Sequence, residues 1–119
     1  MATIELRRVH DVVGERKQAP TFLVDRIWPR GVAKDDLDID AWVRDIAPST
    51  ELRKWFGHDP ARWAEFRKRY LSELAENSDA AEPLLNAARN GRLVLLFAAK
   101  DTEHNQAVVI REWLQRHKL

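Results

Sequence analysis

Residues 25–31, with the sequence Asp-Arg-Ile-Trp-Pro-Arg-Gly, place two guanidinium groups, a carboxylate and an indole where an apolar run gives way to a loop. Arginine binds phosphate and carboxylate through paired hydrogen bonds, so Arg26 and Arg30 indicate a site for an anion, with Asp25 orienting them. The alternative is structural, because arginine and carboxylate pairs also bury the ends of strands. Trp28 has the same two interpretations, as a ligand contact or as part of the core.

Histidine side chains add groups that can transfer a proton near neutral pH. His58 lies between a glycine and an Asp-Pro step, which predicts a turn between two helices. His104 is expected in the first turn of the last helix, where the helix dipole favours a neutral ring. Asp25 is the third candidate for acid–base catalysis. Both histidines are also explained as solvated turn or cap residues, and the sequence leaves the two interpretations open.

Other chemistries find little support in the sequence. Ser49 and Thr50 lie beside Arg53 and could supply a hydroxyl nucleophile, but helix capping explains them as well. The chain has no cysteine, and its four histidines lack the spacing of a helical pair of ligands, so we expect no metal site. We also expect no cofactor, because the sequence contains neither a glycine-rich phosphate loop nor a dinucleotide fingerprint.

Three segments have the patterns of β-strands. Residues 3–9 alternate between apolar and charged side chains, whereas residues 21–27 and 92–99 contain runs that are apolar on both faces. Such runs are typical of interior strands in a parallel sheet. The polar residues 11–19 show no periodicity and predict a loop.

Helical patterns fill the interval between the second and third predicted strands, as in a crossover between parallel strands. Ser49 or Thr50 can cap a first helix that ends near Gly57, and Asp59 with Pro60 can begin a second. The two predicted strands should therefore be parallel neighbours.

The remaining helices complete the prediction. A capping box from Asp79 to Glu82 indicates a third helix that ends at Gly91, and a last helix begins near Asp101 or Thr102. Residues 40–46 are ambiguous. We predict one domain over residues 1–119, a compact, three-layer-like α/β fold with a small, mostly parallel sheet and several helices.

This topology predicts the position of a ligand site. Ligands of open parallel sheets bind beyond the carboxyl ends of the strands, which here are residues 25–31 and 98–105. Arg26 and Arg30 would hold the anion there. The residues expected in or beside this crevice are Asp25, Arg26, Trp28, Arg30, His58, Lys100, His104 and Asn105.

Length and composition fit a single core, with 119 residues of which 45% are hydrophobic. The absence of cysteine and of a charged-then-apolar leader favours the cytoplasm. No apolar run approaches the ~20 residues that a membrane span needs. A formal net charge of +1 argues against a wholly basic nucleic-acid binder, although it does not address local patches. The oligomeric state is not indicated.

Several segments together resemble the YeaO-like family of bacterial domains of unknown function. They are residues 25–31, 47–53 and 66–74, with Lys100-Asp101 and residues 104–107. The resemblance spans nearly the whole chain and also favours a role for His58. It implies a family without an established activity, so it carries no catalytic residue over to this chain.

Two functions from different classes follow. The first is a small enzyme or ligand-binding domain that acts on an anionic, phosphate- or nucleotide-like molecule at the strand ends. The second is a nucleic-acid-binding or regulatory protein with a helix-turn-helix broken at Gly57, which would use the basic residues Arg62, Arg67, Lys68 and Arg69. The enzyme or ligand-binding function is favoured, because the aromatic residues of the second predicted helix lie on the face expected to pack against the core. A scaffold without a ligand is a third alternative.

Overall fold

The computed structural model describes residues 2–117, which form an α/β domain around a four-stranded sheet. The strands are β1 (Thr3–Arg8), β2 (Thr21–Leu23), β3 (Ala41–Trp42) and β4 (Arg92–Phe97). Their order is β1-β4-β2-β3, and every pairing is parallel. The predicted compact α/β fold is confirmed, and the sheet is entirely parallel within the described residues.

The apolar strand β4 is the centre of the sheet. Its residues pair with β1 from Thr3↔Arg92 onward and with β2 from Thr21↔Val94 onward. The predicted parallel neighbours are therefore confirmed. Strand β1 lies at an edge of the sheet, which fits its alternation of apolar and charged side chains.

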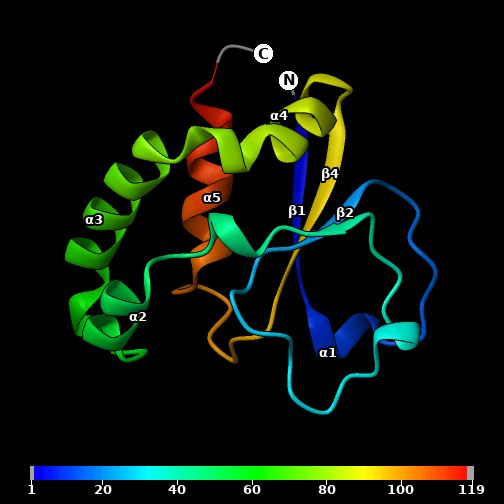
Figure 1. The fold of residues 1–119 in the computed structure, drawn as a ribbon, viewed down its shortest axis with the longest axis horizontal. Helices are drawn as coiled ribbons and strands as arrows, with labels where there is room; N and C mark the ends of the chain where they lie inside the picture. Colours follow the sequence, from blue (N-terminus) through cyan, green and yellow to red (C-terminus); the bar gives the residue numbers. More distant parts are fainter. Residues whose placement is uncertain (1, 118–119) are drawn as a thin grey trace.

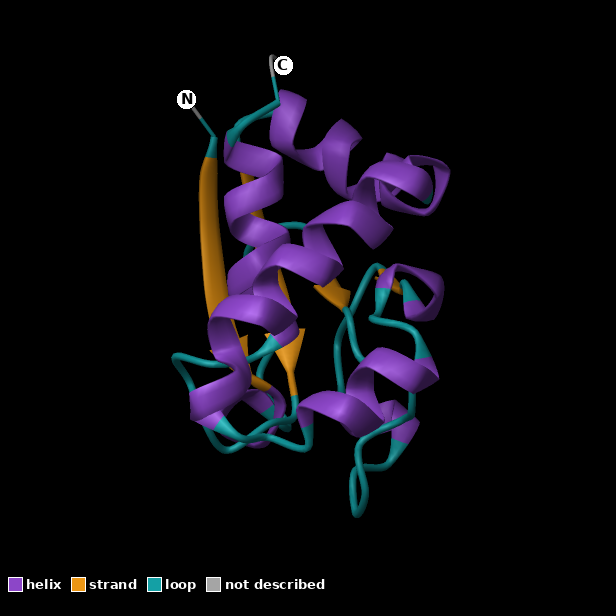
Figure 2. Cartoon of the chain, turned by 90° about the vertical axis from the view of Figure 1, so that its left-hand side faces the viewer, coloured by secondary structure: helices purple, strands orange, loops and turns teal. Residues whose placement is uncertain are grey.

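Helices cover one face of the sheet, and a short helix with long loops covers the other (Figures 1 and 2). The first group comprises α2 (Thr50–Phe56), α3 (Trp63–Glu76), α4 (Glu82–Arg89) and α5 (Gln106–Gln115), and the second face carries α1 (Val9–Val12). Two buried clusters match this division. One joins Leu93, Leu95 and Phe97 to the large helices, and the other joins Val94 and Leu96 to α1 and the loop residues.

The predicted strand 21–27 is too long, because the backbone ladder stops soon after β2. The Val24 N–H still donates to the Leu96 carbonyl at 3.1 Å, but the N–H of Ala98, just after the neighbouring strand β4, donates to the carboxylate of Asp25 at 3.1 Å. A side chain thus replaces the backbone acceptor. The predicted strand 3–9 likewise ends early, at Arg8, and the buried Val9 begins α1, which reaches into the residues 11–19 predicted as a loop.

The first two predicted helices are confirmed, including their caps. The Ser49 side chain accepts the N–H of Leu52, and Gly57 ends α2 in the left-handed conformation with φ 54°. Asp59 accepts the N–H of Ala61 and begins a 3-10 turn, Pro60–Arg62, that leads into α3.

Two other helix starts are predicted wrongly. The capping box is not formed, because residues 78–81 make a 3-10 turn and α4 begins at Glu82 with Pro83 in its first turn. The last helix, α5, begins at Gln106 and not near Asp101. Within residues 2–117, no helix is both long and apolar enough to cross a bilayer.

Candidate functional site

A cavity of about 450 Å³ lies beyond the carboxyl ends of β2 and β4, within the size range of small-molecule pockets. Three segments build most of its wall: residues 25–27 after β2, residues 47–58 with α2, and residues 98–106, which end at the first residue of α5. Phe66 of α3 contributes from the helical layer. The parallel topology accounts for this position, because it directs both strand ends to the same edge of the sheet.

Asp25 is the acidic side chain that lines this cavity. One carboxylate oxygen accepts the backbone N–H of Ala98 at 3.1 Å, and the other accepts a hydrogen bond from the side-chain amide of Gln106. Burial raises the pKa of the Asp25 carboxyl from 3.8 to about 6, and the hydrogen bonds and the charges of Arg53 and His58 oppose that rise. Asp25 therefore changes its charge close to neutral pH.

Arg26 links two of the segments that line the cavity. Its Nη2 donates to the Ala47 carbonyl at 2.9 Å and its Nε donates to the Pro48 carbonyl at 3.2 Å. A guanidinium group has five N–H donors, so part of this side chain is still able to meet a ligand. The contacts nonetheless make Arg26 a structural link between the end of β2 and the start of α2.

Arg53, Lys54 and His58 bring positive or titratable groups to the α2 side of the cavity. In the part of the chain that the structure describes, their side chains make no hydrogen bond or ion pair. His58 has a left-handed backbone with φ 55°, which is uncommon for a residue with a side chain. Cationic groups without partners beside a cavity are available to bind an anion.

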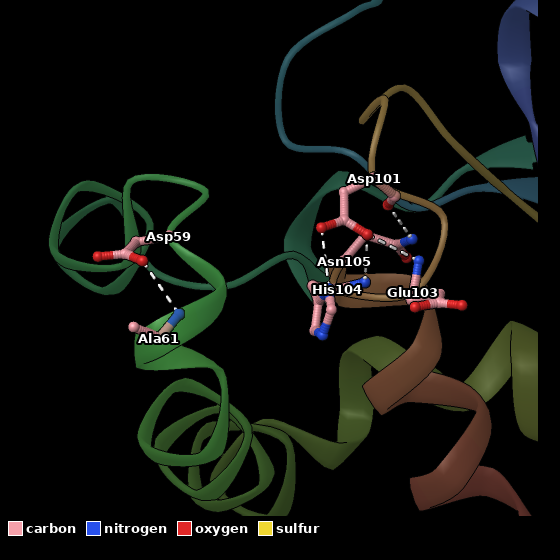
Figure 3. Close-up of polar contacts among 6 residues, drawn as sticks. All are labelled: Asp59, Ala61, Asp101, Glu103, His104 and Asn105. Carbon is pink, nitrogen blue, oxygen red and sulfur yellow. Dashed lines mark hydrogen bonds and ion pairs between the residues drawn. The ribbon is translucent and has the colours of Figure 1, made fainter.

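His104 is held by Asp101 (Figure 3). Its Nδ1 lies 2.9 Å from a carboxylate oxygen of Asp101, and the other oxygen accepts the N–H groups of Glu103 and His104. These hydrogen bonds lower the pKa of the Asp101 carboxyl. The ring also packs edge-on against Trp63, with 5.2 Å between centroids. The geometry leaves Nε2 as the ring nitrogen available to a ligand.

Asn105 also lines the cavity, but its polar atoms are already used as a helix cap. Its Oδ1 accepts the N–H groups of Ala107 at 3.0 Å and Val108 at 3.3 Å, and its Nδ2 donates to the Asp101 carbonyl at 2.9 Å. This residue is only 2% exposed. The free N–H groups in the first turn of α5 are therefore largely hydrogen-bonded without a ligand.

Three other predicted site residues lie outside the lining of the cavity: Trp28, Arg30 and Lys100. Trp28 donates from Nε1 to the Val32 carbonyl at 2.7 Å and packs edge-on against Trp42, next to the second core cluster. Arg30 and Lys100 are exposed. The structure thus brings together Asp25, Arg26, His58, His104 and Asn105, and not the other three.

Replacing Arg30 by alanine should change the free energy of unfolding by less than about 1 kcal/mol, because the side chain is exposed and lies past the end of β2. Urea denaturation measures this directly. The same variant tests the expectation that Arg30 also holds the anion. If Arg30 does so, its replacement by alanine should weaken anion binding. Unfolding of the variant would show instead that Arg30 is a structural tie.

The basic helical surface expected of a nucleic-acid binder is partly neutralised. Arg67 forms a two-pronged ion pair with Glu112, with Nε 2.7 Å from one oxygen, and Arg69 pairs with Glu65 at 2.8 Å. Arg62 lies 3.8 Å from a carboxylate oxygen of Asp59. These pairs reduce the positive charge that phosphates could use.

The described residues contain no group of three or more histidine, aspartate or glutamate side chains that could hold a metal ion.

The chain matches the family described as the inactive DUF488-N3 subclade over residues 3–118. It is 43% identical to the uncharacterized protein YeaO of Escherichia coli K12 over 112 residues, which are 94% of this chain and 96% of that protein. It is 52% identical over 79 residues, 66% of each chain, to the uncharacterized proteins Mb3100c of Mycobacterium bovis and Rv3073c of Mycobacterium tuberculosis H37Rv. No solved structure matches it.

Proposed function

The chain belongs to the inactive DUF488-N3 subclade and is YeaO-like, and from this premise we propose that it is a ligand-binding domain for a small anionic molecule. The description of the family as inactive favours binding over turnover. We propose the cytoplasm as its compartment, because the chain contains no cysteine.

One observation carries this proposal: Arg53, Lys54 and His58 line a cavity of about 450 Å³, and within residues 2–117 their side chains make no hydrogen bond or ion pair. A guanidinium and an ammonium group on one helix can bind the oxygens of a phosphate together. The Coulombic effect of Arg53 and His58 on the pKa of Asp25 indicates that these charges act on the interior of the cavity.

The apolar part of the wall supports a ligand that is more than a bare ion. Phe56 and Phe66 line the cavity and stack on each other, with 4.3 Å between centroids and 13° between planes. Ile27 also lines it and is 63% exposed. An anionic group joined to a flat or apolar group, as in a nucleotide, would use both kinds of surface.

A catalytic role is the second candidate, and the contact of Asp101 with His104 is the observation that favours it. In a neutral ring, donation from Nδ1 to a carboxylate leaves Nε2 as an acceptor, which is the arrangement of a general base. Turnover of a phosphate ester by the purified protein would establish this role, and binding without turnover would exclude it for that ester.

Arg53→Ala and Lys54→Ala should each weaken binding of a nucleoside monophosphate by about tenfold, because a hydrogen bond to a charged group is worth about 1.5–3 kcal/mol. Isothermal titration calorimetry at fixed ionic strength measures the affinity. The matched control is Lys68→Ala, which removes an exposed lysine of α3 that does not line the cavity.

Loss of affinity in the Lys68→Ala variant, with no change in the cavity variants, would contradict the proposal. The same variants should be titrated with duplex DNA. Binding of the duplex that is weakened by Lys68→Ala and unchanged by Arg53→Ala would favour the nucleic-acid alternative.

A further inference from the structure

The cavity proposed to bind an anion also contains the carboxylate of Asp25, and this is unusual for an anion site. An ionised carboxylate repels a second negative charge. The other charged or titratable groups that line the cavity are Arg26, Arg53, Lys54, His58 and His104. Asp25 is thus one acidic group among basic ones, and its presence needs a reason.

Structure alone does not require the acid at this position. The contacts of Asp25 are with the Ala98 N–H and the Gln106 amide, and asparagine or glutamine side chains can make comparable contacts. Burial raises the pKa of Asp25, so keeping an ionised carboxyl here lowers the stability of the fold. A residue that weakens the fold and lines a cavity is a candidate for a role in ligand recognition.

The remaining hydrogen-bonding capacity of Asp25 indicates what it would recognise. A carboxylate has about four lone-pair positions, and two of them are used by Ala98 and Gln106. A further partner in the cavity must therefore donate a hydrogen, or accept one if Asp25 is protonated. An anion can satisfy this condition only if one proton is shared between the anion and Asp25.

We propose that Asp25 makes the cavity selective for an oxyanion that keeps or takes up a proton near neutral pH, namely phosphate or a phosphate monoester, over one that stays fully ionised, such as sulfate. This inference rests on the proposed function. Phosphate monoesters have a second pKa of about 6, close to that of the buried carboxyl, so a shared proton costs little. Sulfate contributes no proton, so it either faces the carboxylate or requires Asp25 to take up a proton, which is unfavourable above about pH 6.

Titrations of the whole protein with inorganic phosphate and with sodium sulfate test the selectivity. At about pH 7.5 and constant ionic strength, the wild-type protein should bind phosphate about tenfold or more tightly than sulfate, since the discrimination rests on a hydrogen bond to a charged group. Asp25→Asn should bring the two affinities within about threefold, mainly through tighter sulfate binding, because the asparagine N–H groups donate to either anion.

Glu51→Gln is the matched control, because it removes one negative charge from an exposed residue of α2 that does not line the cavity. This variant should keep the wild-type preference for phosphate. If Asp25→Asn does not fold, as judged by circular dichroism, Asp25→Ser provides the same test, since its hydroxyl also donates to either anion.

Equal binding of phosphate and sulfate by the wild-type protein would overturn the inference, and so would a preference for phosphate that survives in the Asp25 variant. Binding of neither anion by any variant would overturn the proposed function as well. An added titration with adenosine 5′-monophosphate separates two sources of the phosphate group. Tighter binding than inorganic phosphate identifies a phosphate monoester as the ligand class, and equal binding identifies the free ion.

Discussion

Asp25→Asn is expected to stabilise the folded protein by up to about 3 kcal/mol above pH 6 and to leave its stability unchanged near pH 4. The cause is burial, which raises the pKa of the carboxyl from 3.8 to about 6. A raised pKa means that the folded state binds a proton more tightly than the unfolded chain does. The stabilising contribution of Asp25 is therefore complete below about pH 4 and is lost as the pH rises to about 6 and beyond.

Asparagine removes this titration and keeps the shape of the side chain. Its carbonyl can accept the N–H of Ala98, and the Gln106 amide can turn to present its oxygen to the new N–H group. Urea denaturation of both proteins at several values between about pH 4 and pH 8 gives the difference in the free energy of unfolding. A difference that does not grow over this range would show that the carboxyl is not destabilised by burial.

The second large effect is expected at Arg26, whose replacement by alanine should lower the free energy of unfolding by about 2–4 kcal/mol. The guanidinium group donates to the carbonyls of Ala47 and Pro48 at 2.9 and 3.2 Å. Both of these residues are buried. Removal of the donor leaves two carbonyl groups without this partner, at about 1–3 kcal/mol each, and water in the cavity that both residues line offsets part of that cost.

Arg26→Lys should lie between the wild-type protein and the alanine variant, because an ammonium group can satisfy one carbonyl more easily than two. Chemical denaturation provides the measurement, and Arg30→Ala provides the control for loss of a neighbouring arginine. An Arg26→Ala protein with wild-type stability and reduced anion affinity would reverse the assignment and make Arg26 a ligand residue.

Much of the fold could be predicted from local patterns. The apolar run in β4 and the helical block before it predict an interior strand with a parallel neighbour, and β2 has that position. The strand β3 could not be predicted, because its two residues are too few to show a periodicity. Its pairing depends on contacts with β2 that are distant in the sequence.

The start of α5 shows why helix boundaries are harder to predict. Asp101 and Asn105 are both good capping residues, and each accepts backbone N–H groups of the residues that follow it. The turn capped by Asp101 stops, whereas the turn capped by Asn105 continues into buried apolar residues. Local chemistry is equal at the two positions, so only the packing of the next turns decides between them.

The site was predicted in part for a similar reason. Asp25, Arg26, His58, His104 and Asn105 line the cavity. Arg53 and Lys54 also line it and are not predicted by the strand-end rule, because they lie on the helix α2 and not after a strand. The signal that could have found them is their place in α2 shortly after the Ser49 cap, in the segment that resembles the family.

The contact between Gln106 and Asp25 could not be inferred from either segment alone. The two residues follow different strands and meet because β2 and β4 are parallel neighbours. A prediction of this kind needs the register of the sheet, which hydrophobic patterns do not define.

The central position of β4 also has a consequence for synthesis of the protein on the ribosome. Both β1 and the longer pairing of β2 depend on β4, while β2 and β3 share only two residue pairs. A nascent chain whose residues 92–97 have not yet left the ribosome can form helical turns, but it cannot assemble the sheet. Its apolar strands then lack their partners, and the exposed apolar surface makes such an incomplete chain prone to aggregation.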